Sequence, residues 1–356
     1  MRGSNGWCLY AWSGHVTGEY GLTQAGRATG SAQLTADGKR SHLRMGDDHQ
    51  SQAAPSRVAL LAAFAAIYLI WGSTYLAIRF AIETLPPFLM TGVRFVVAGS
   101  AMYIWARGTG LSRPTRSQWA AATLVGTLML LFGVGGVSWA EQWVPSGVAA
   151  LIVAVGPLSM VLVDWLFFGG ARPDRKVMIG ILLGFAGVAL LIGPEQVAGS
   201  ERIDLAGVGV ILLGTITWSF GSLYSRGPHL PSSPAQAIGM EMLAGGIVLL
   251  AVGTAFGEWM TVSWADISLR SLLALGYLAL FGSVIALSAY LWLLKVTTPA
   301  RVVTHAYVNP VVAVLLGWAL AEEQLNARVL AASMVIIAGV LVITSRKEPS
   351  AEIEHG

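Results

Sequence analysis

Apolar and polar stretches alternate along the chain from Arg57 to Arg346. The apolar stretches run for about 17–25 residues, and short polar breaks separate them. A helix of about 20 apolar residues crosses the roughly 30 Å hydrocarbon core of a bilayer, so each stretch has the length of a membrane span. The alternation predicts ten spans, at residues 58–82, 86–106, 118–140, 145–168, 177–193, 204–225, 234–256, 269–294, 299–320 and 326–345.

The composition points the same way. The chain is 55% hydrophobic and 12% charged, whereas a soluble domain is about 25% charged. This balance excludes a soluble enzyme, a disordered protein and a nucleic-acid-binding protein. It predicts an all-α polytopic membrane protein that contacts the lipid bilayer and no nucleic acid.

Motifs for cofactors and metals are missing from the sequence. The single cysteine, Cys8, excludes an intramolecular disulfide and a multi-thiolate metal site. The sequence also has no phosphate-binding loop, no H-E-x-x-H motif and no dinucleotide fingerprint after a strand. We therefore expect no cofactor, no metal and no direct use of ATP.

The two ends of the chain differ from the rest. Residues 1–55 are rich in Gly, Ser, Thr and Ala and hold no apolar run long enough to span. We expect a disordered polar tail there, with a regulatory tail as the alternative, and the sequence leaves open whether translation starts at Met1 or Met45. Residues 347–356 are expected to form a short cytoplasmic tail.

Basic residues gather in alternate loops, and acidic residues gather in the others. The basic loops hold Arg57, Arg107, Arg113, Arg116, Arg172, Arg175, Lys176, Arg226, Lys295, Arg301, Arg346 and Lys347. Cytoplasmic loops carry an excess of Lys and Arg. The alternation stays in phase through all ten predicted spans, so both termini are expected on the cytoplasmic side of the inner membrane.

The chain also repeats itself after about 145–153 residues. Trp71–Arg79 corresponds to Trp218–Arg226 in the spacing from tryptophan to arginine, and Gly92 and Gly99 correspond to Gly239 and Gly246. Pro157 corresponds to Pro310, and Phe185–Val188 corresponds to Ile337–Val340. Each repeat holds five spans, an odd number, so the second copy enters the membrane from the opposite face. Such inverted repeats mark secondary transporters, with a substrate site near the midplane.

Several motifs resemble those of the EamA branch of the drug/metabolite transporter superfamily, and within it the YedA-like exporters. They are Tyr68–Tyr75, Gly92–Phe95, Val144–Gly147, Glu241–Ala244, Gly276–Ser283 and Ala306–Pro310. The resemblance implies ten transmembrane helices, arranged as two EamA repeats at residues 56–194 and 203–346 around a central cavity. It also implies export of small metabolites or drugs.

The chain departs from this family at the end of the fourth span. Family repeats often end the fourth and ninth spans with a glutamate. The second half keeps it, in Glu322 and Glu323, whereas the first half has Phe168-Gly169-Gly170.

Aromatic residues form stripes on the first and sixth spans. Trp71 and Tyr75 share a helical face with Tyr68 and Arg79, and Trp218 lies on the repeat-equivalent face. These rings offer stacking surface to an organic substrate. Packing between helices is the alternative explanation.

Two charged residues occupy equivalent places in the second and seventh spans, Arg94 and Glu241. A charge inside the membrane is costly and tends to be functional. They either form a structural pair, or bond to helix carbonyls, or bind substrate charge or protons.

Two prolines fall near the middle of the fourth and ninth spans. Pro157 and Pro310 predict helix kinks that free the carbonyls of Val153 and Ala306. The remaining candidates for the substrate pathway are Ser283, Tyr290, His305, Tyr307 and Asn309. His305 is the only histidine in the predicted spans, and an unperturbed histidine titrates near pH 6.5. It is therefore a candidate for the pathway, with a packing role as the alternative.

Two further features have simpler explanations. Glu141, near the outer end of the third span, is expected to be a solvated loop acid. Gly180, Gly184 and Gly339 predict close helix contacts. The sequence leaves open whether these contacts lie within one chain or between the subunits of a homodimer.

The sequence therefore predicts a secondary transporter that exports small organic molecules (amino acids, metabolites or drugs) by alternating access. A channel or a non-transporting sensor is the main alternative, and an intramembrane enzyme is a third. The sequence does not decide between proton coupling and facilitated diffusion.

Overall fold

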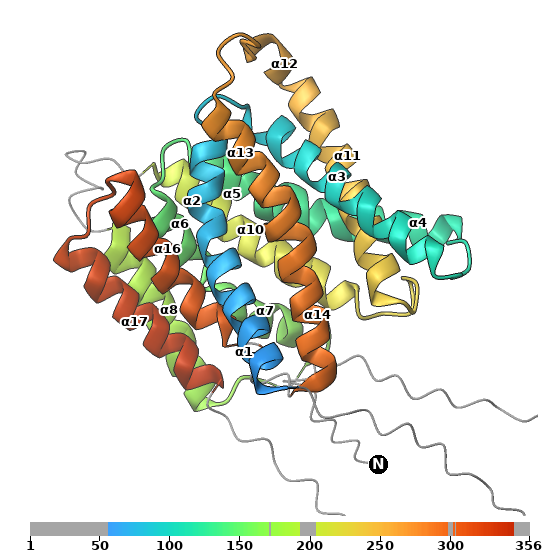
Figure 1. Ribbon diagram of the computed structural model, residues 1–356. Helices are drawn as coiled ribbons and strands as arrows, with labels where there is room; N and C mark the ends of the chain where they lie inside the picture. The colour runs from blue at the N-terminus through green and yellow to red at the C-terminus, as the bar shows by residue number, and fades with distance from the viewer. Residues whose placement is uncertain (1–55, 171, 193–203, 298–301, 303, 345–356) are drawn as a thin grey trace, which may run out of the picture.

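A computed structural model describes residues 56–170, 172–192, 204–297, 302 and 304–344, and over these residues every regular element is a helix (Figure 1). The two predicted tails, 1–55 and 347–356, lie outside the described residues. In Figure 1, α1 (Arg57–Ala65) begins and α17 (Ala327–Thr344) ends at the same end of the bundle.

Three of the predicted spans contain a π-helical segment. The first runs through α1, η1 (Ala66–Ile70) and α2 (Trp71–Ala81). The third runs through α4 (Arg116–Gly126), η2 (Thr127–Gly135) and α5 (Gly136–Ala140). The eighth runs through α13 (Leu269–Tyr277), η3 (Leu278–Ile285) and α14 (Ala286–Val296).

The other helices follow the predicted ranges closely. The fourth span is divided into α6 (Ser146–Val153) and α7 (Gly156–Phe167). The remaining helices are α3 (Pro87–Gly108), α8 (Arg175–Ile192), α10 (Leu205–Tyr224), α11 (Pro234–Ala255), the short α12 (Glu258–Thr261), α16 (His305–Ala321) and α17.

Seven helical runs among the described residues are long and apolar enough to cross a membrane. They are Arg57–Ala81, Pro87–Gly108, Arg116–Ala140, Ser146–Phe167, Leu205–Tyr224, Pro234–Ala255 and Leu269–Tyr290. Two shorter apolar helices cover Val308–Ala321 and Ala327–Val342. The protein is therefore a polytopic membrane protein, and crossing by all ten predicted spans stays a prediction.

Local sequence signals explain where many helices begin. Thr115 and Gln118 form a capping box at the start of α4, and the carboxylate of Asp204 accepts hydrogen bonds from the first turn of α10. Ser268 caps α13. These side chains satisfy N–H groups that have no partner inside the helix.

Helices α3 and α11 pack closely and run antiparallel. A methyl group on Gly99 would meet the backbone nitrogen of Leu243, and one on Gly246 would lie 2.7 Å from the backbone nitrogen of Val96. The contacting residue number falls along α11 as it rises along α3, so the two helices run in opposite directions. Glycine at these two positions permits the close approach of the two backbones.

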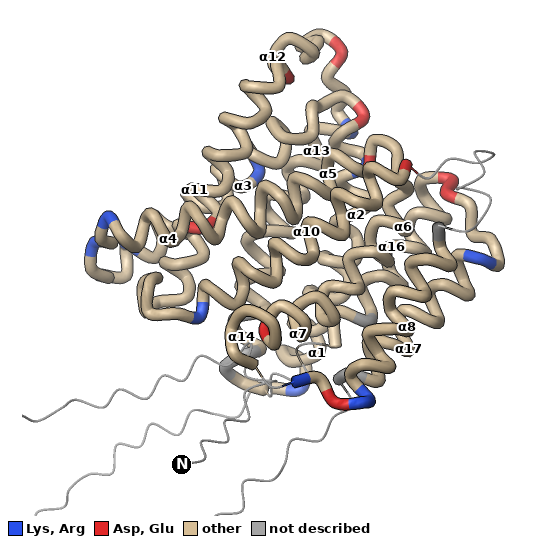
Figure 2. The backbone as a smooth tube through the Cα atoms, turned by 180° about the vertical axis from the view of Figure 1, so that it is seen from behind, with Lys and Arg blue, Asp and Glu red and all other residues tan. Residues whose placement is uncertain are grey.

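Helices α8 and α17 form a second antiparallel pair. A methyl group on Gly339 would lie 2.8 Å from the backbone oxygen of Gly180 and 2.9 Å from the nitrogen of Gly184. One on Gly187 would lie 3.1 Å from the nitrogen of Ile336. The predicted small-residue contact is therefore made within one chain. This pair forms one flank of the molecule, and α3, α4 and α11 form the other (Figures 1 and 2).

The fourth span is the most enclosed of the seven long apolar runs among the described residues. In the run Ser146–Phe167, 67% of the most apolar window is buried inside the structure, against 28% for Leu269–Tyr290. Its residues Leu151 and Leu158 belong to a core cluster that also contains Ile211 of α10 and Ile336 of α17. The fourth span is thus surrounded by helices from both halves of the chain.

Charged residues lie mostly near the two ends of the bundle (Figure 2). We call the acidic end the one that carries α12 and the loops at residues 82–86, 141–145, 256–268 and 322–326. The opposite, basic end carries the loops at residues 109–115 and 225–233. This distribution agrees with the alternation of charged loops along the sequence.

We predict that Gly99→Ala destabilises the folded protein, because the new methyl group meets the backbone of α11 rather than a flexible side chain. Overpacking costs about 1–3 kcal/mol, so the melting temperature of the purified protein in detergent should fall. Gly209→Ala in α10 is the matched control, since nothing lies within 4 Å of its added methyl group. Equal melting temperatures for the two variants would contradict the close α3–α11 contact.

Candidate functional site

Three of the predicted pathway residues form an aromatic cluster. The ring of Trp71, the first residue of α2, lies 5.3 Å from that of Tyr290 in α14 and 5.0 Å from that of His305, the first residue of α16. The rings of Tyr290 and His305 are 6.0 Å apart. Tilted and edge-on contacts at these separations are favourable. The cluster joins the first, eighth and ninth spans.

Hydrogen bonds hold the edges of this cluster. His305 Nδ1 lies 2.9 Å from the carbonyl oxygen of Val302; a carbonyl only accepts, so Nδ1 carries the proton. The amide nitrogen of Asn309 donates to the carbonyls of His305 at 3.1 Å and Tyr68 at 3.3 Å. The Tyr68 hydroxyl lies 2.5 Å from the Thr304 hydroxyl. The start of α16 is thus tied to the first span.

Two consecutive residues of η3 connect Trp71 to Arg94. Trp71 Nε1 donates to the carbonyl oxygen of Gly282 at 3.0 Å, and Arg94 Nε donates to Ser283 Oγ at 3.0 Å. The Ser283 hydroxyl in turn donates to the Leu278 carbonyl at 3.1 Å. A π-helical turn changes which backbone groups are free to bond, and such turns are frequent at functional sites. We call the Gly282–Ser283 pair and the two side chains bound to it the η3 junction.

Arg94 and Glu241 do not form an ion pair within the described part of the chain. Arg94 is buried, and its hydrogen-bond partner is the hydroxyl of Ser283. Glu241 is half-buried on α11, where its backbone oxygen lies against Gly126 of α4. The predicted structural pair between them is therefore not made in this conformation.

Trp218, a residue of α10, packs against the π-helical segment of the third span. A methyl group on Gly133 in η2 would lie 2.9 Å from Cε3 of the Trp218 ring. Trp71 and Trp218 are equivalent in the repeat, and each one contacts a glycine of a π-helical segment in the other half of the chain. Trp218 is therefore separate from the Trp71 cluster.

Two other predicted residues also stand outside the cluster. Tyr75 is half-buried and interacts electrostatically with Glu141. Tyr307 lies in α16, but its side chain is outside the described part of the structure. The structure thus brings together Trp71, Arg94, Ser283, Tyr290, His305 and Asn309, and leaves Tyr75, Trp218 and Glu241 elsewhere.

The two prolines differ in effect. Pro157 stands at the start of α7, after a turn at Ala154 and Val155 that divides the fourth span. Pro310 lies inside the continuous helix α16. In both cases the ring lacks the N–H that would bond the carbonyl four residues earlier. The prediction of a kink understated the change at Pro157, where the α-helix is interrupted.

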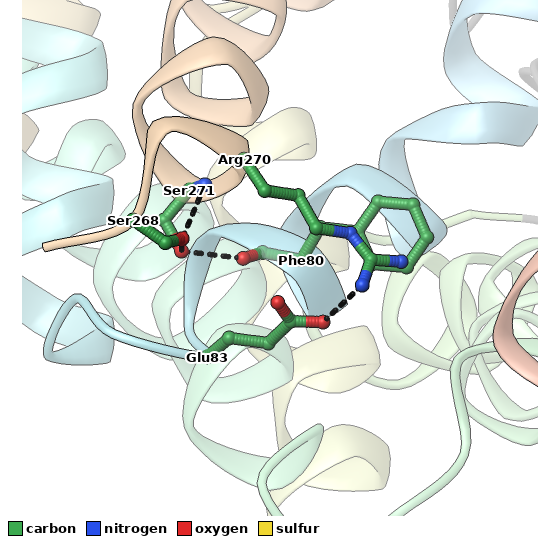
Figure 3. A network of polar contacts seen from close by, with 5 residues as sticks. All are labelled: Phe80, Glu83, Ser268, Arg270 and Ser271. Atoms are coloured by element: carbon green, nitrogen blue, oxygen red, sulfur yellow. Dashed lines mark hydrogen bonds and ion pairs between the residues drawn. The ribbon is translucent and has the colours of Figure 1, made fainter.

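At the acidic end, polar contacts tie the eighth span to the first (Figure 3). Ser271 Oγ donates to the Phe80 carbonyl at 2.8 Å, and Arg270 lies over the Phe80 ring with its guanidinium carbon 3.6 Å from the centroid. The same guanidinium is 3.2 Å from Glu83. The side chains of that ion pair are 51% and 38% exposed, so the pair contributes little by itself, whereas Ser271 is a buried residue.

Two glutamates of the second half cap helices of the first half. Glu323 accepts hydrogen bonds from the Ser146 nitrogen at 2.6 Å, the Ser146 hydroxyl at 2.7 Å and the Gly147 nitrogen at 2.9 Å. Glu258 accepts from the nitrogens of Phe88 at 3.2 Å and Leu89 at 2.8 Å. A carboxylate at a helix N-terminus is favoured by the helix dipole. Sequence reasoning missed both roles, because each cap joins residues more than 160 positions apart.

The expectation that Glu141 is a solvated loop acid is wrong. Glu141 is 0% exposed, and its backbone oxygen accepts a hydrogen bond from Arg79 Nη1 at 2.6 Å. Neither carboxylate oxygen has a hydrogen-bond partner among the described residues. The residue is enclosed because the ends of the first, third and ninth spans converge on it.

A pocket of about 370 Å³ lies at the acidic end, beside the end of α16. Its lining consists of Trp318, Glu322, Glu323, Gln324, Leu325 and Asn326. None of the predicted pathway residues lines it. The predicted central cavity therefore stays a prediction.

Comparisons with known proteins add to this geometry. The chain matches the EamA-like transporter family over residues 57–193 and 205–345. It is 41% identical over 289 residues to YedA of Escherichia coli K12, an uncharacterized inner membrane transporter, and the match covers 81% of this chain and 91% of that protein. It is 23% identical over 298 residues to the uncharacterized transporter YvbV of Bacillus subtilis, a match that covers 83% and 94% of the two chains.

A solved crystal structure has the same fold. It is 22% identical to this chain with a TM-score of 0.55, and the match covers 82% of this chain and 98% of that one. The family match spans most of the chain and both of its halves. The chain therefore belongs to the EamA-like transporter family.

Proposed function

We propose that the protein is a secondary transporter that exports small organic molecules across the cytoplasmic membrane by alternating access. The observation that carries this proposal is the η3 junction, where residues of the two halves meet. Trp71 and Arg94 come from the first half, and Gly282 and Ser283 come from the second. A buried polar and aromatic cluster at such a seam suits a substrate site in a transporter built from repeats.

The two halves are, in this proposal, inverted repeats. Repeat-equivalent helices pack antiparallel: α3 with α11 and α8 with α17. The contacts themselves repeat, since Gly187 meets Ile336 while its equivalent, Gly339, meets Gly184. Two copies related by a two-fold axis in the membrane plane would produce this pairing.

The π-helical segments also recur at equivalent places. η2 in the third span corresponds to η3 in the eighth, and each receives a tryptophan of the other half, Trp218 and Trp71. Because the two contacts differ in detail, the two halves need not move identically. The aromatic cluster with His305 and Tyr290 surrounds Trp71 only.

The chemistry of the junction suits an amphipathic organic substrate. Trp71, Tyr290 and His305 offer aromatic surface, and the Arg94 guanidinium offers a buried positive charge whose protein partner is a neutral hydroxyl. A substrate carboxylate would bind Arg94 more strongly than the hydroxyl does. Amino acids, acidic metabolites and aromatic drugs therefore belong to the substrate class that we propose.

Alternating access requires one end to close while the other opens. In this conformation the acidic end is held by Arg79 to Glu141, by Ser271 to Phe80 and by Glu323 to the start of α6. Each of these contacts joins two spans. Opening of the acidic end would break them, and the junction between the two halves would act as the pivot.

Transport by the purified protein tests the proposal. We predict that proteoliposomes move radiolabelled amino acids, acidic metabolites or aromatic drugs faster than empty vesicles do. A lack of movement for all three probe classes would contradict it. Ion currents far above carrier rates would favour the alternative, a channel, and product formation without vectorial movement would favour an enzyme.

Trp71→Phe tests the η3 junction. The variant keeps an aromatic ring and loses the bond from Nε1 to Gly282, which is worth about 1–2 kcal/mol inside a membrane. We predict a loss of transport of about fivefold to thirtyfold. The matched control is Trp105→Phe, because Trp105 of α3 is 63% exposed on the outer surface. Equal rates for the two variants would remove Trp71 from the pathway.

The orientation of the bundle can be read with single cysteines, since Cys8 is the only native one. In a Cys8→Ser background we predict that Met260→Cys, at the acidic end and 93% exposed, reacts with an impermeant thiol reagent in intact cells. Ser112→Cys, at an exposed position in the basic loop after α3, should react only in permeabilised cells. The reverse pattern would place the acidic end in the cytoplasm.

A further inference from the structure

Glu141 carries a buried carboxyl group that the contacts described above leave unused. The side chain is 0% exposed, and both of its oxygens lack a hydrogen-bond partner among the described residues. Other enclosed acids at this end are engaged, as Glu323 and Glu258 show by capping helices. A carboxylate in such surroundings loses its hydration without compensation.

The groups that face Glu141 do not pair with its carboxylate. From α2, Arg79 donates Nη1 to the backbone oxygen of Glu141, and Tyr75 stands one turn before it. From the residues after α16, Glu323 presents a second negative charge. Helix α10 also packs on α5, and Asp204, the residue before α10, accepts hydrogen bonds from the backbone nitrogens of Ala206 and Gly207.

Among the described residues, the remaining neighbours named here supply no charge. Helix α3 meets α5 through the Thr91 hydroxyl, which donates to Ser138 Oγ at 2.9 Å. From α10, a methyl group on Gly207 would meet the side chains of Val144 and Ala140. The carboxyl group therefore lies among apolar atoms and hydroxyls, with one cation and one anion nearby.

The protonation state follows from these surroundings. Glu141 comes directly after the run Arg116–Ala140. Burial raises the pKa of its carboxyl group well above the usual range, the charge of Glu323 raises it further, and Arg79 opposes both effects. Because the pKa is raised, this conformation binds a proton more tightly than one in which water reaches the carboxyl group, so lower pH stabilises this conformation.

We propose that Glu141 is a proton-binding site, and that closure of the acidic end takes up one proton there. When the acidic end opens, Arg79 leaves the Glu141 carbonyl and water reaches the carboxyl group, which then releases its proton. The closed and open forms therefore differ by one bound proton. This inference rests on the proposed function only in that the acidic end must open.

Infrared spectroscopy of the purified protein in lipid vesicles tests the proposal without any substrate. At neutral pH, the difference between wild type and Glu141→Gln should contain the C=O band of a protonated carboxylic acid. The control Glu322→Gln removes an exposed acid one residue from Glu323 and should give only the carboxylate band. A carboxylate band for Glu141 at neutral pH would overturn the proposal.

Accessibility at the acidic end measures the coupling to conformation. Leu85→Cys in a Cys8→Ser background reports opening through its rate of reaction with an impermeant thiol reagent, because Leu85 is half-buried at this end. For a site that binds one proton, the ratio of open to closed forms should rise up to about tenfold per pH unit. Glu141→Gln should remove this dependence, whereas Glu322→Gln should keep it. A pH dependence that persists in Glu141→Gln would overturn the proposal.

These measurements separate the two proposals. If the infrared and accessibility results hold while no probe crosses the membrane, the proton site stands and the proposed function fails. If transport proceeds while Glu141 is ionised and the pH dependence persists in Glu141→Gln, the proposed function stands and the proton site fails.

Discussion

Inside a bilayer no water is available, so every polar group must find its partner within the protein. Hydrogen bonds within the helices satisfy most backbone groups. The other buried polar groups, on backbone and side chains, find partners on other helices. The Gly282 carbonyl in η3 accepts from Trp71, and the N-terminus of α6 is satisfied by Glu323. Arg94 is held by the hydroxyl of Ser283. In each case the partner comes from the other half of the chain, so the same constraint that builds the helices also joins the two halves.

The packing between halves combines two kinds of contact. On the flanks, α3 packs on α11 and α8 packs on α17 through glycines. At these contacts the two backbones lie so close that an added methyl group would meet the backbone of the other helix. Between the flanks, the contacts are aromatic and polar, as in the cluster of Trp71, Tyr290 and His305. Close glycine contacts leave little room for movement, whereas hydrogen bonds and tilted rings exchange partners at low cost. We therefore expect the flanks to move as units and the centre to rearrange.

Glu141 is an exception to the rule of satisfied polar groups. Its carboxyl group is enclosed and has no hydrogen-bond partner among the residues that the structure describes. The Glu323 carboxylate, which interacts with it electrostatically, accepts three hydrogen bonds. Of these two acids at the same end of the bundle, Glu323 has a structural role as a helix cap. Glu141 is the one that we propose to bind a proton. A group that lacks a partner in one conformation is a natural place for a proton to be bound and released.

The sequence by itself determined the helical ranges and the two halves, because hydrophobic length and repeat spacing can be read along the chain. It named Trp71, Ser283, Tyr290, His305 and Asn309 only as members of a larger candidate set, and the structure showed which of the candidates meet. The tertiary structure alone decided the η3 junction, the break before Pro157, the caps formed by Glu258 and Glu323, and the burial of Glu141. These features depend on which distant residue lies opposite a given atom. Hydropathy reports only whether a residue prefers lipid or water, and it does not report the partner that the fold supplies.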